Sequence, residues 1–239
     1  MKYSPKVNER FASSSKIEDL HPNQPSETVQ GVLEIMYETD LFLRELSGLD
    51  RFSFQPGGGS QAALGMASIM RAYQKSRNEE QDRDEIITTI FSHPSNAAAS
   101  AVKGFRVVTI YPDENGYPDL EALKNAVSQR TAGLIVTNPE DTGVFNPRIR
   151  EFTQIVHEVG GLCGYDQANA NGILGITRAK EAGFDMCFFN LHKTFSSPHG
   201  CGGPGSGALG VRKDLERFLP VPIVDFDGKK YSLNYDLPD

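Results

Sequence analysis

The segment around Lys193 has the residue types that a covalent cofactor site requires. NLHKTF (190–195) follows an apolar run and precedes a loop rich in glycine, histidine and hydroxyl side chains. A single lysine in a loop is usually solvated. A lysine between a buried strand and such a loop can instead have its amine shielded from water. Desolvation leaves the amine deprotonated often enough to attack an aldehyde. Lys193 is therefore a candidate for Schiff-base chemistry.

Other polar residues stand where predicted strands end. Asp166 closes GLCGYD, Thr137 closes GLIVT, and His93 follows IITTIFS. The carboxyl ends of parallel strands meet at one edge of a sheet, which is where ligands bind. A strand-end aspartate can equally cap the next helix, and a lone histidine is more often structural than catalytic. Facing a pyridine nitrogen, however, such a carboxylate would keep the ring protonated and make it an electron sink.

A glycine run, Gly57-Gly58-Gly59-Ser60, follows FSFQ and opens a predicted helix. Three glycines before a helix can form a simple tight turn, but their unhindered N–H groups also attract an anion. The run lacks the GK[ST] of a Walker motif, and Ala62 stands where a Rossmann GxGxxG needs its last glycine. A lysine, a strand-end aspartate and an anion-binding helix start together specify pyridoxal 5'-phosphate (PLP) better than a nucleotide.

Short β-branched or aromatic runs alternate with amphipathic segments from residue 51 onward, which predicts an α/β fold. We expect a mostly parallel seven-stranded sheet with helices on both faces. The last strand should run antiparallel, because only a tight glycine loop precedes it. Ser26 is expected to cap the first long helix. The predicted strands are 51–54, 85–91, 105–111, 133–137, 161–165, 185–190 and 207–211, and the predicted helices are 26–46, 60–76, 96–103, 119–127 and 146–159.

Composition limits the partners and the compartment. The 239 residues carry 31 acidic and 24 basic side chains, a net charge of −7, whereas nucleic-acid binding needs a clustered positive surface. No apolar run reaches the roughly 18 residues of a membrane span. Cys163, Cys187 and Cys201 lack CxxC spacing, which predicts neither a disulfide nor a metal site and favours a cytoplasmic protein. We expect an N-terminal segment with a helix (1–50), a main domain (51–220) and the hairpin-like start of a further segment (221–239).

Longer motifs resemble one family. NLHKTFSSPHGCGGPGSG (190–207) is closely similar to the cofactor-lysine motif of the glycine decarboxylase P-protein, in the second subunit of its two-subunit form. MKYSPKVNERF, HPNQPSETVQGVLEIMYE, LIVTNPEDTGVF, IVHEVGGLCGYDQANANGILG and FLPVP extend the likeness along nearly the whole chain, in the expected order. The resemblance implies the large domain of a fold-type I PLP-dependent enzyme.

The resemblance also implies residue roles. Lys193 matches the lysine that forms the internal aldimine, His93 a histidine that stacks on the ring, and His192 an active-site neighbour. Asp166 matches the carboxylate that faces the pyridine nitrogen, and Thr137 a residue on the ring's hydroxyl side. The implied cofactor-binding set is Lys193, Asp166, His93, Thr137, Gly59 and Ser60 at the phosphate, and Thr194 or Ser196 as further contacts.

The implied reaction is decarboxylation of glycine with transfer of the aminomethyl group to the lipoyl group of the H-protein. It implies a partner P-protein subunit 1 and a homo- or hetero-oligomer. Two departures qualify the likeness. Gln61 and Ala63 stand where the family usually has a histidine and a glutamate. The chain is also about half as long as that subunit, which implies a fragment, an excised piece of the longer protein or a degenerate copy, with negligible activity alone. The alternatives are another fold-type I enzyme, such as a group V aminotransferase or desulfurase, and a non-catalytic scaffold subunit.

Overall fold

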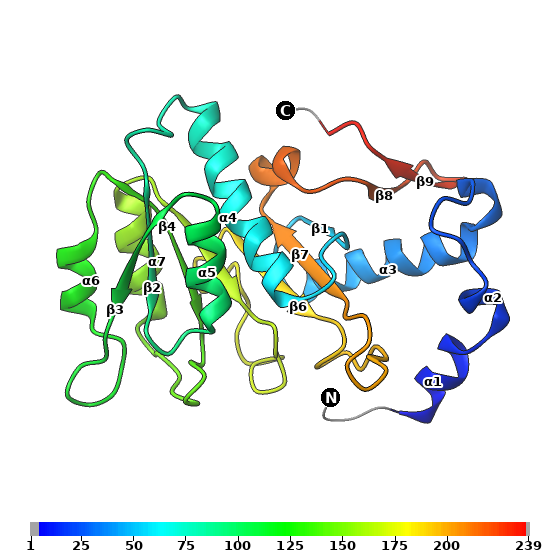
Figure 1. The fold of residues 1–239 in the computed structure, drawn as a ribbon, viewed down its shortest axis with the longest axis horizontal. Coiled ribbons are helices and arrows are strands. Elements are labelled where there is room, and N and C mark those ends of the chain that lie inside the picture. The colour runs from blue at the N-terminus through cyan, green and yellow to red at the C-terminus, as the bar shows by residue number, and fades with distance from the viewer. Residues whose placement is uncertain (1–4, 238–239) are drawn as a thin grey trace.

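The computed structural model describes residues 5–237 and contains one seven-stranded sheet with helices on both faces (Figure 1). The strand order is β1-β7-β6-β5-β4-β2-β3. Strands β2 to β6 run parallel, while β7 is antiparallel to both β6 and β1. The mostly parallel sheet and the reversed last strand are therefore confirmed.

All seven predicted strands and the four helices after residue 59 are found, with ends shifted by up to three residues. The strands are β1 (Arg51–Ser53), β2 (Glu85–Thr89), β3 (Arg106–Ile110), β4 (Thr131–Thr137), β5 (Leu162–Asp166), β6 (Met186–Asn190) and β7 (Gly207–Val211). The helices are α1 (Lys6–Ala12), α2 (Ser15–Glu18), α3 (Gln30–Ser47), α4 (Gly59–Ser76), α5 (Pro94–Val102), α6 (Leu120–Ala126) and α7 (Ile149–Glu158), with 3₁₀ turns η1 (Ser26–Thr28) and η2 (Lys213–Phe218).

The predicted helix start at Ser26 is wrong. Ser26 lies in the turn η1, where the Thr28 hydroxyl donates to the carbonyl of Pro25 at 2.8 Å and closes the turn locally. Val29 follows with φ −124°, outside the helical range, and α3 begins at Gln30 without a side-chain cap. The hydroxyl groups that favoured a cap thus stabilise a separate turn.

Two apolar layers enclose the sheet. Side chains alternate between the faces of each strand, so that neighbours such as Ile86 and Ile87 enter opposite layers. One layer holds α3, α6 and α7, and the other holds α4, α5 and η2. Central strands β5 and β6 are buried along their whole length, as expected for a parallel sheet covered on both sides.

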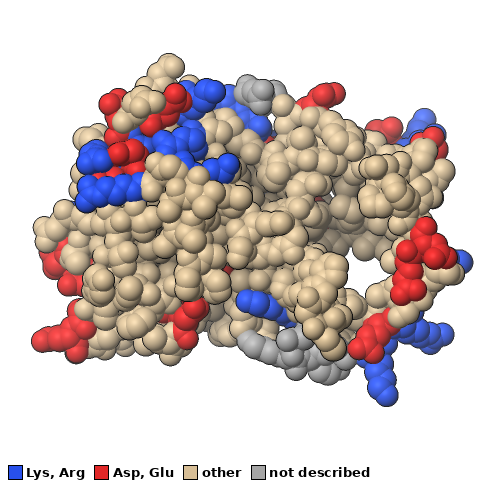
Figure 2. Space-filling view, in the orientation of Figure 1, with Lys and Arg blue, Asp and Glu red and all other residues tan. Residues whose placement is uncertain are grey.

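The N-terminal segment holds three helices and η1 rather than a single helix. Helices α1 and α2 bury no residue, and Figure 2 shows a gap between this segment and the rest of the chain. The expected hairpin is present as β8 (Ile223–Phe226) and β9 (Tyr231–Asn234). It packs on α3, where the Tyr37 ring centre lies 5.8 Å from that of Phe226. The three predicted domain ranges stay a prediction, and residues 1–4 and 238–239 lie outside the described part.

Charged side chains of both signs are intermixed over the left of the view in Figure 2. At the start of β2 they form ion pairs, including Arg130–Asp84 at 2.6 Å and Arg106–Glu85 at 3.0 Å. None of the helices among residues 5–237 has the length and apolar character needed to cross a membrane.

A buried polar cluster also lies at the amino-terminal ends of β5 and β6. The Asp185 carboxylate accepts from the Cys163 amide at 2.6 Å, pairs with Arg212, and lies 2.9 Å from His157 Nε2. Burial raises the pKa of the Cys163 thiol well above its usual range. The Asp185 carboxylate therefore connects α7, β5 and the end of β7, and the Cys163 thiol beside it stays neutral.

Candidate active site

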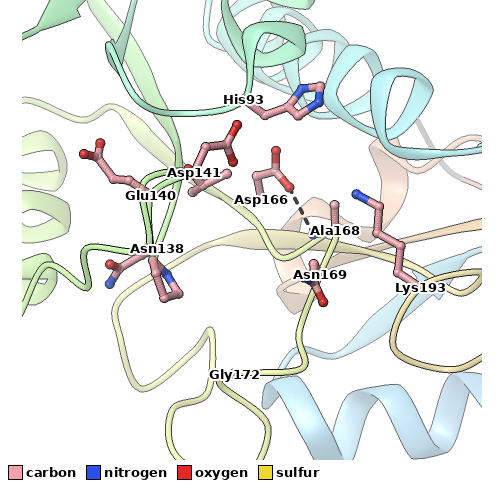
Figure 3. A pocket seen from close by; sticks show the side chains of 12 residues that line it. His93, Asn138, Glu140, Asp141, Asp166, Ala168, Asn169, Gly172 and Lys193 are labelled. Carbon is pink, nitrogen blue, oxygen red and sulfur yellow. Dashed lines mark hydrogen bonds between the residues drawn. The ribbon is translucent and has the colours of Figure 1, made fainter. Parts of the chain in front are cut away.

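Two adjoining cavities lie at the carboxyl ends of the parallel strands, as Figure 3 shows for the larger one. The larger cavity, of about 330 Å³, reaches from Lys193 to the loop after β4. The smaller cavity, of about 90 Å³, reaches toward the start of α4. The two share four lining residues, His93, Asp166, Ala168 and Lys193. Loops after β2, β4, β5 and β6 therefore meet in one site.

Lys193 stands three residues beyond the end of β6. Its backbone amide donates to the Asn190 carbonyl at 2.9 Å, and its carbonyl accepts from the Ser196 amide at 3.2 Å. These bonds fold the chain back at the end of the strand. The half-buried side chain then extends with its amine toward the side of the cavity that holds Asp166 and His93 (Figure 3). The amine is therefore accessible to a ligand in either cavity.

Asp166 is the last residue of β5 and is only 5 % exposed. Its Oδ1 accepts from the Ala168 amide at 3.0 Å and its Oδ2 from Asn96 Nδ2 at 3.1 Å. Burial raises the pKa of the carboxyl, while these two hydrogen bonds and the nearby His93 and Lys193 act to lower it. The site therefore holds a buried acid whose ionised form is supported by donors on two sides.

His93 and Thr137 are fixed by the loop between β2 and α5. His93 is the N-cap of α5, and its Nδ1 accepts from the Ser95 amide at 3.1 Å. That bond turns the ring so that it lines both cavities. The Thr137 amide, at the end of β4, donates to Ser92 Oγ at 3.0 Å. Both residues contribute to the wall of the larger cavity.

The first turn of α4 forms the wall of the smaller cavity with Gly59 and Ser60. No side chain caps this helix; the Gln61 side chain instead accepts from the Gly57 amide at 2.6 Å. A Cβ at Gly59 would come within 3.0 Å of Asn190 Nδ2. The Asn190 Oδ1 is buried without a hydrogen-bond partner. The free N–H groups of an uncapped helix start are suited to an anionic group.

Three further predicted site residues do not line either cavity. Thr194 Oγ1 accepts from the Ala170 amide at 2.8 Å, so it ties two loops together. Ser196 has φ +60° and its carbonyl accepts from Asn8 Nδ2 at 3.1 Å. His192 Nδ1 accepts from the Ser206 amide at 3.0 Å, and burial lowers the pKa of its ring. These contacts shape the loop that carries Lys193.

Several residues of the site could not be identified from the sequence patterns. Asn190 lines the smaller cavity and is the first residue of the lysine motif, yet no pattern marks it as a site residue. Asn96 lines neither cavity but is buried beside Asp166. Glu140 and Asp141 follow the end of β4 and line the larger cavity. Glu140 is only 4 % exposed with an unpartnered Oε1, and burial raises its pKa. Their position directly after a strand end was the signal that could have found them.

The two residues that depart from the family motif, Gln61 and Ala63, both have structural contacts of their own. Ala63 is fully buried in the apolar layer under α4. Gln61 is engaged with the Gly57 amide. Neither residue lines the two cavities.

This architecture, a mostly parallel sheet with a lysine after β6 and an acid at the end of β5, defines the fold-type I class of PLP-dependent enzymes. Residues 57–230 match the family described as aminotransferase class-V, and the chain belongs to that family.

The similarity to curated proteins is more specific. The chain is 49 % identical over 240 residues to the "Probable glycine dehydrogenase (decarboxylating) subunit 2" of Pyrococcus abyssi, covering 100 % of this chain and 48 % of the relative. A protein of the same name from Caldanaerobacter subterraneus subsp. tengcongensis is 49 % identical over 238 residues, with 100 % and 49 % covered. The resemblance predicted from the motifs is confirmed. The chain spans about half the length of these relatives.

Solved structures support the fold. Glycine decarboxylase (P-protein) of the glycine cleavage system, in inhibitor-bound form, matches with a TM-score of 0.78 at 21 % identity, covering 98 % of this chain and 52 % of that one. A NifS-like protein matches with a TM-score of 0.71 at 19 % identity, covering 96 % and 60 %. The fold class is therefore confirmed, and it is shared by enzymes with different names.

Proposed function

We propose that the two cavities bind PLP. Lys193 would carry the aldehyde carbon, Asp166 would face the pyridine nitrogen, and the amides of Gly59 and Ser60 would hold the phosphate. His93 would stack on the ring, with Thr137 on its hydroxyl side. The shared lining supports this arrangement, since Asp166, His93 and Lys193 line both cavities and the smaller one also includes Gly59 and Ser60.

When bound, PLP supplies an electron-withdrawing pyridinium ring that stabilises negative charge at the α-carbon of an amino acid. The protein residues would set its electronic state and its position. Asp166 would hold the proton on the ring nitrogen, and its burial would strengthen that charge interaction. The amides at the start of α4 would fix the phosphate and thereby prevent the ring from sliding. His93, held by Ser95, would restrict the tilt of the ring.

We further propose that the reaction is decarboxylation of glycine, with transfer of the aminomethyl group to the lipoyl group of the H-protein. The observation that carries this proposal is identity of 49 % over the full chain to proteins named glycine dehydrogenase (decarboxylating) subunit 2. The fold alone does not choose the reaction, because the NifS-like protein shares it. The name "subunit 2" supports a partner subunit 1, and hence an oligomer.

Activity should require more protein than these 239 residues. The chain spans about half of its curated relatives. The larger cavity is bounded by exposed loop residues such as Asp141. A negatively charged carbon in an open site would be protonated by water before productive transfer. We therefore propose that the remaining part of the longer protein, subunit 1 and lipoylated H-protein complete the site.

The test is release of carbon dioxide from carboxyl-labelled glycine. We compare the 239-residue chain with the same chain joined to the remaining residues of the Pyrococcus abyssi relative, each with subunit 1 and lipoylated H-protein. Release is expected only from the longer protein and should vanish with Lys193→Ala. Equal release by the 239-residue chain under the same conditions would refute the need for the rest of the protein. No release by the longer protein would refute the proposed reaction.

A further inference from the structure

Asn96 is a buried residue next to the proposed cofactor site that the sequence motifs did not single out. It lies in the first turn of α5, three positions after His93, and its side chain is 0 % exposed. Its Nδ2 donates to Asp166 Oδ2 at 3.1 Å. Its own Oδ1 has no hydrogen-bond partner. The amide thus makes its donor bond to Asp166 while its buried acceptor stays unsatisfied.

The backbone of α5 sets the place of Asn96. Its amide donates to the His93 carbonyl at 2.9 Å, and its carbonyl accepts from Ser100 Oγ at 2.7 Å. This backbone hydrogen bond holds Asn96 and the cavity residue His93 in one helical turn. The start of α5 also carries the positive end of the helix dipole, which favours a negative charge nearby.

The donor that Asn96 presents to Asp166 indicates which form of the carboxyl the amide supports. An ionised carboxylate has acceptors only, and it is satisfied by the Nδ2 donor that it meets in the structure. A protonated carboxyl could instead donate to Oδ1 only after a half-turn of the amide, and Nδ2 would then lose the acceptor that it has in the structure. The observed orientation thus favours the ionised carboxylate over the neutral acid.

We propose that Asn96 is a positioning residue that keeps the Asp166 carboxylate ionised and holds its Oδ2 in a fixed direction. The proposal rests on the proposed function, since this charge serves the reaction only if Asp166 faces a pyridine nitrogen. The groups around the carboxylate are Asn96 from α5, the Ala168 amide from the loop after β5, and the titratable His93 and Lys193. Tyr165, its neighbour in β5, bonds to the Asn138 carbonyl instead.

The test is the pKa of Asp166 in the 239-residue chain without cofactor. Carboxyl-labelled aspartate is followed by NMR through a pH titration, with the signal assigned by its loss in Asp166→Asn. Asn96→Leu keeps a similar volume but removes the donor. It should raise the pKa of Asp166 by about one to two units, the contribution expected for a hydrogen bond to a charged group. Asn96→Asp, which places a like charge beside Asp166, should raise it as well.

Ser100→Ala is the matched control. Ser100 is buried one turn later on the same helix and bonds to Asn96, but it makes no contact with Asp166. This variant should leave the pKa of Asp166 unchanged. An unchanged pKa in both Asn96 variants would overturn the proposal. So would an equal shift in Ser100→Ala, because it would reveal a general effect of packing in α5.

A second measurement separates this proposal from the proposed function. PLP with a ¹⁵N-labelled pyridine nitrogen is added to wild type and to Asn96→Leu, and the nitrogen shift is followed with pH. In wild type the pKa of the ring nitrogen should be higher than in Asn96→Leu by at least about one unit, so that the nitrogen stays protonated to a higher pH. If wild type binds no PLP, the proposed function fails, while the titration without cofactor still tests whether Asn96 lowers the pKa of Asp166. If PLP binds and the two proteins titrate alike, Asn96 has no positioning role.

Discussion

Replacing Gly59 by alanine tests the anion-binding end of the site with a single methyl group. The new Cβ would lie 3.0 Å from Asn190 Nδ2, 3.2 Å from its Oδ1 and 3.3 Å from Phe188 Cε2. Ordinary contacts of this kind begin near 3.4 Å. The Asn190 amide must therefore shift by a few tenths of an ångström, into a cavity of only about 90 Å³. The methyl group takes up space that the phosphate would need.

Two effects on stability oppose each other in Gly59→Ala. Alanine in a helix is favoured over glycine by roughly 0.5–1 kcal/mol, whereas crowding a packed site costs about 1–3 kcal/mol. The free energy of unfolding should therefore fall by no more than about 2.5 kcal/mol. The affinity for PLP should fall further, since losing one charge-assisted hydrogen bond costs about 1.5–3 kcal/mol. That range corresponds to a loss of affinity between about tenfold and about a hundredfold.

The assay is a PLP titration followed by absorbance, combined with thermal unfolding. Gly31→Ala is the matched control, because Gly31 lies in the first turn of α3 and a Cβ there would meet nothing within 4 Å. It should stabilise the protein by roughly 0.5–1 kcal/mol without changing PLP affinity. Unchanged PLP affinity in Gly59→Ala would refute the assignment of the α4 start as the phosphate site.

Two further predictions concern the charged residues of the site. Borohydride reduction of the protein mixed with PLP should attach PLP covalently to Lys193. Lys193→Ala should lose this labelling while changing the free energy of unfolding by less than about 1 kcal/mol. Peptide mapping that finds PLP on another lysine would contradict the assignment. Because burial raises the pKa of Asp166 in the folded state, its ionised form costs stability that returns as the pH falls. Without cofactor, Asp166→Asn should therefore unfold at a higher temperature than wild type at pH 7. The difference should shrink as the pH falls through the raised folded-state pKa of Asp166 and should be lost below the ordinary aspartate pKa of about 3.9. A constant difference across this pH range would show that the charge is not responsible.

The order of strands and helices could be predicted because it depends on local patterns. Runs such as IITT and LCGY are rich in apolar or β-branched residues and are buried on both sides of the strand, and the layers on both faces of the sheet account for that pattern. The start of α3 could not be predicted in this way. Ser26 and Thr28 suit a helix cap and a 3₁₀ turn equally well, and the backbone at Val29 decided between them.

The site could be predicted where a residue stands at a strand end or in a long motif, as Lys193 and Asp166 do. It could not be predicted where function depends on a distant partner. Asn96 and Asp166 are 70 positions apart in the sequence, and no pattern around Asn96 refers to a carboxylate. His192 shows the reverse case, in which a residue of the motif does not line the site. It is adjacent to Lys193 in the motif, yet its ring bonds to Ser206 and lies outside both cavities.

The distance between the start of α4, the proposed phosphate site, and Asp166 depends on glycines in the strands under α4. A Cβ at Gly164 in β5 would lie 2.9 Å from Met66 Sδ, and one at Gly133 in β4 would lie 2.8 Å from Met70 Sδ. Side chains at these positions would push α4 away from the sheet. The helix that begins with Gly59 therefore rests directly on the strand that ends with Asp166. The apolar layer far from the cavities thus determines whether one ligand can reach both the helix start and the acid.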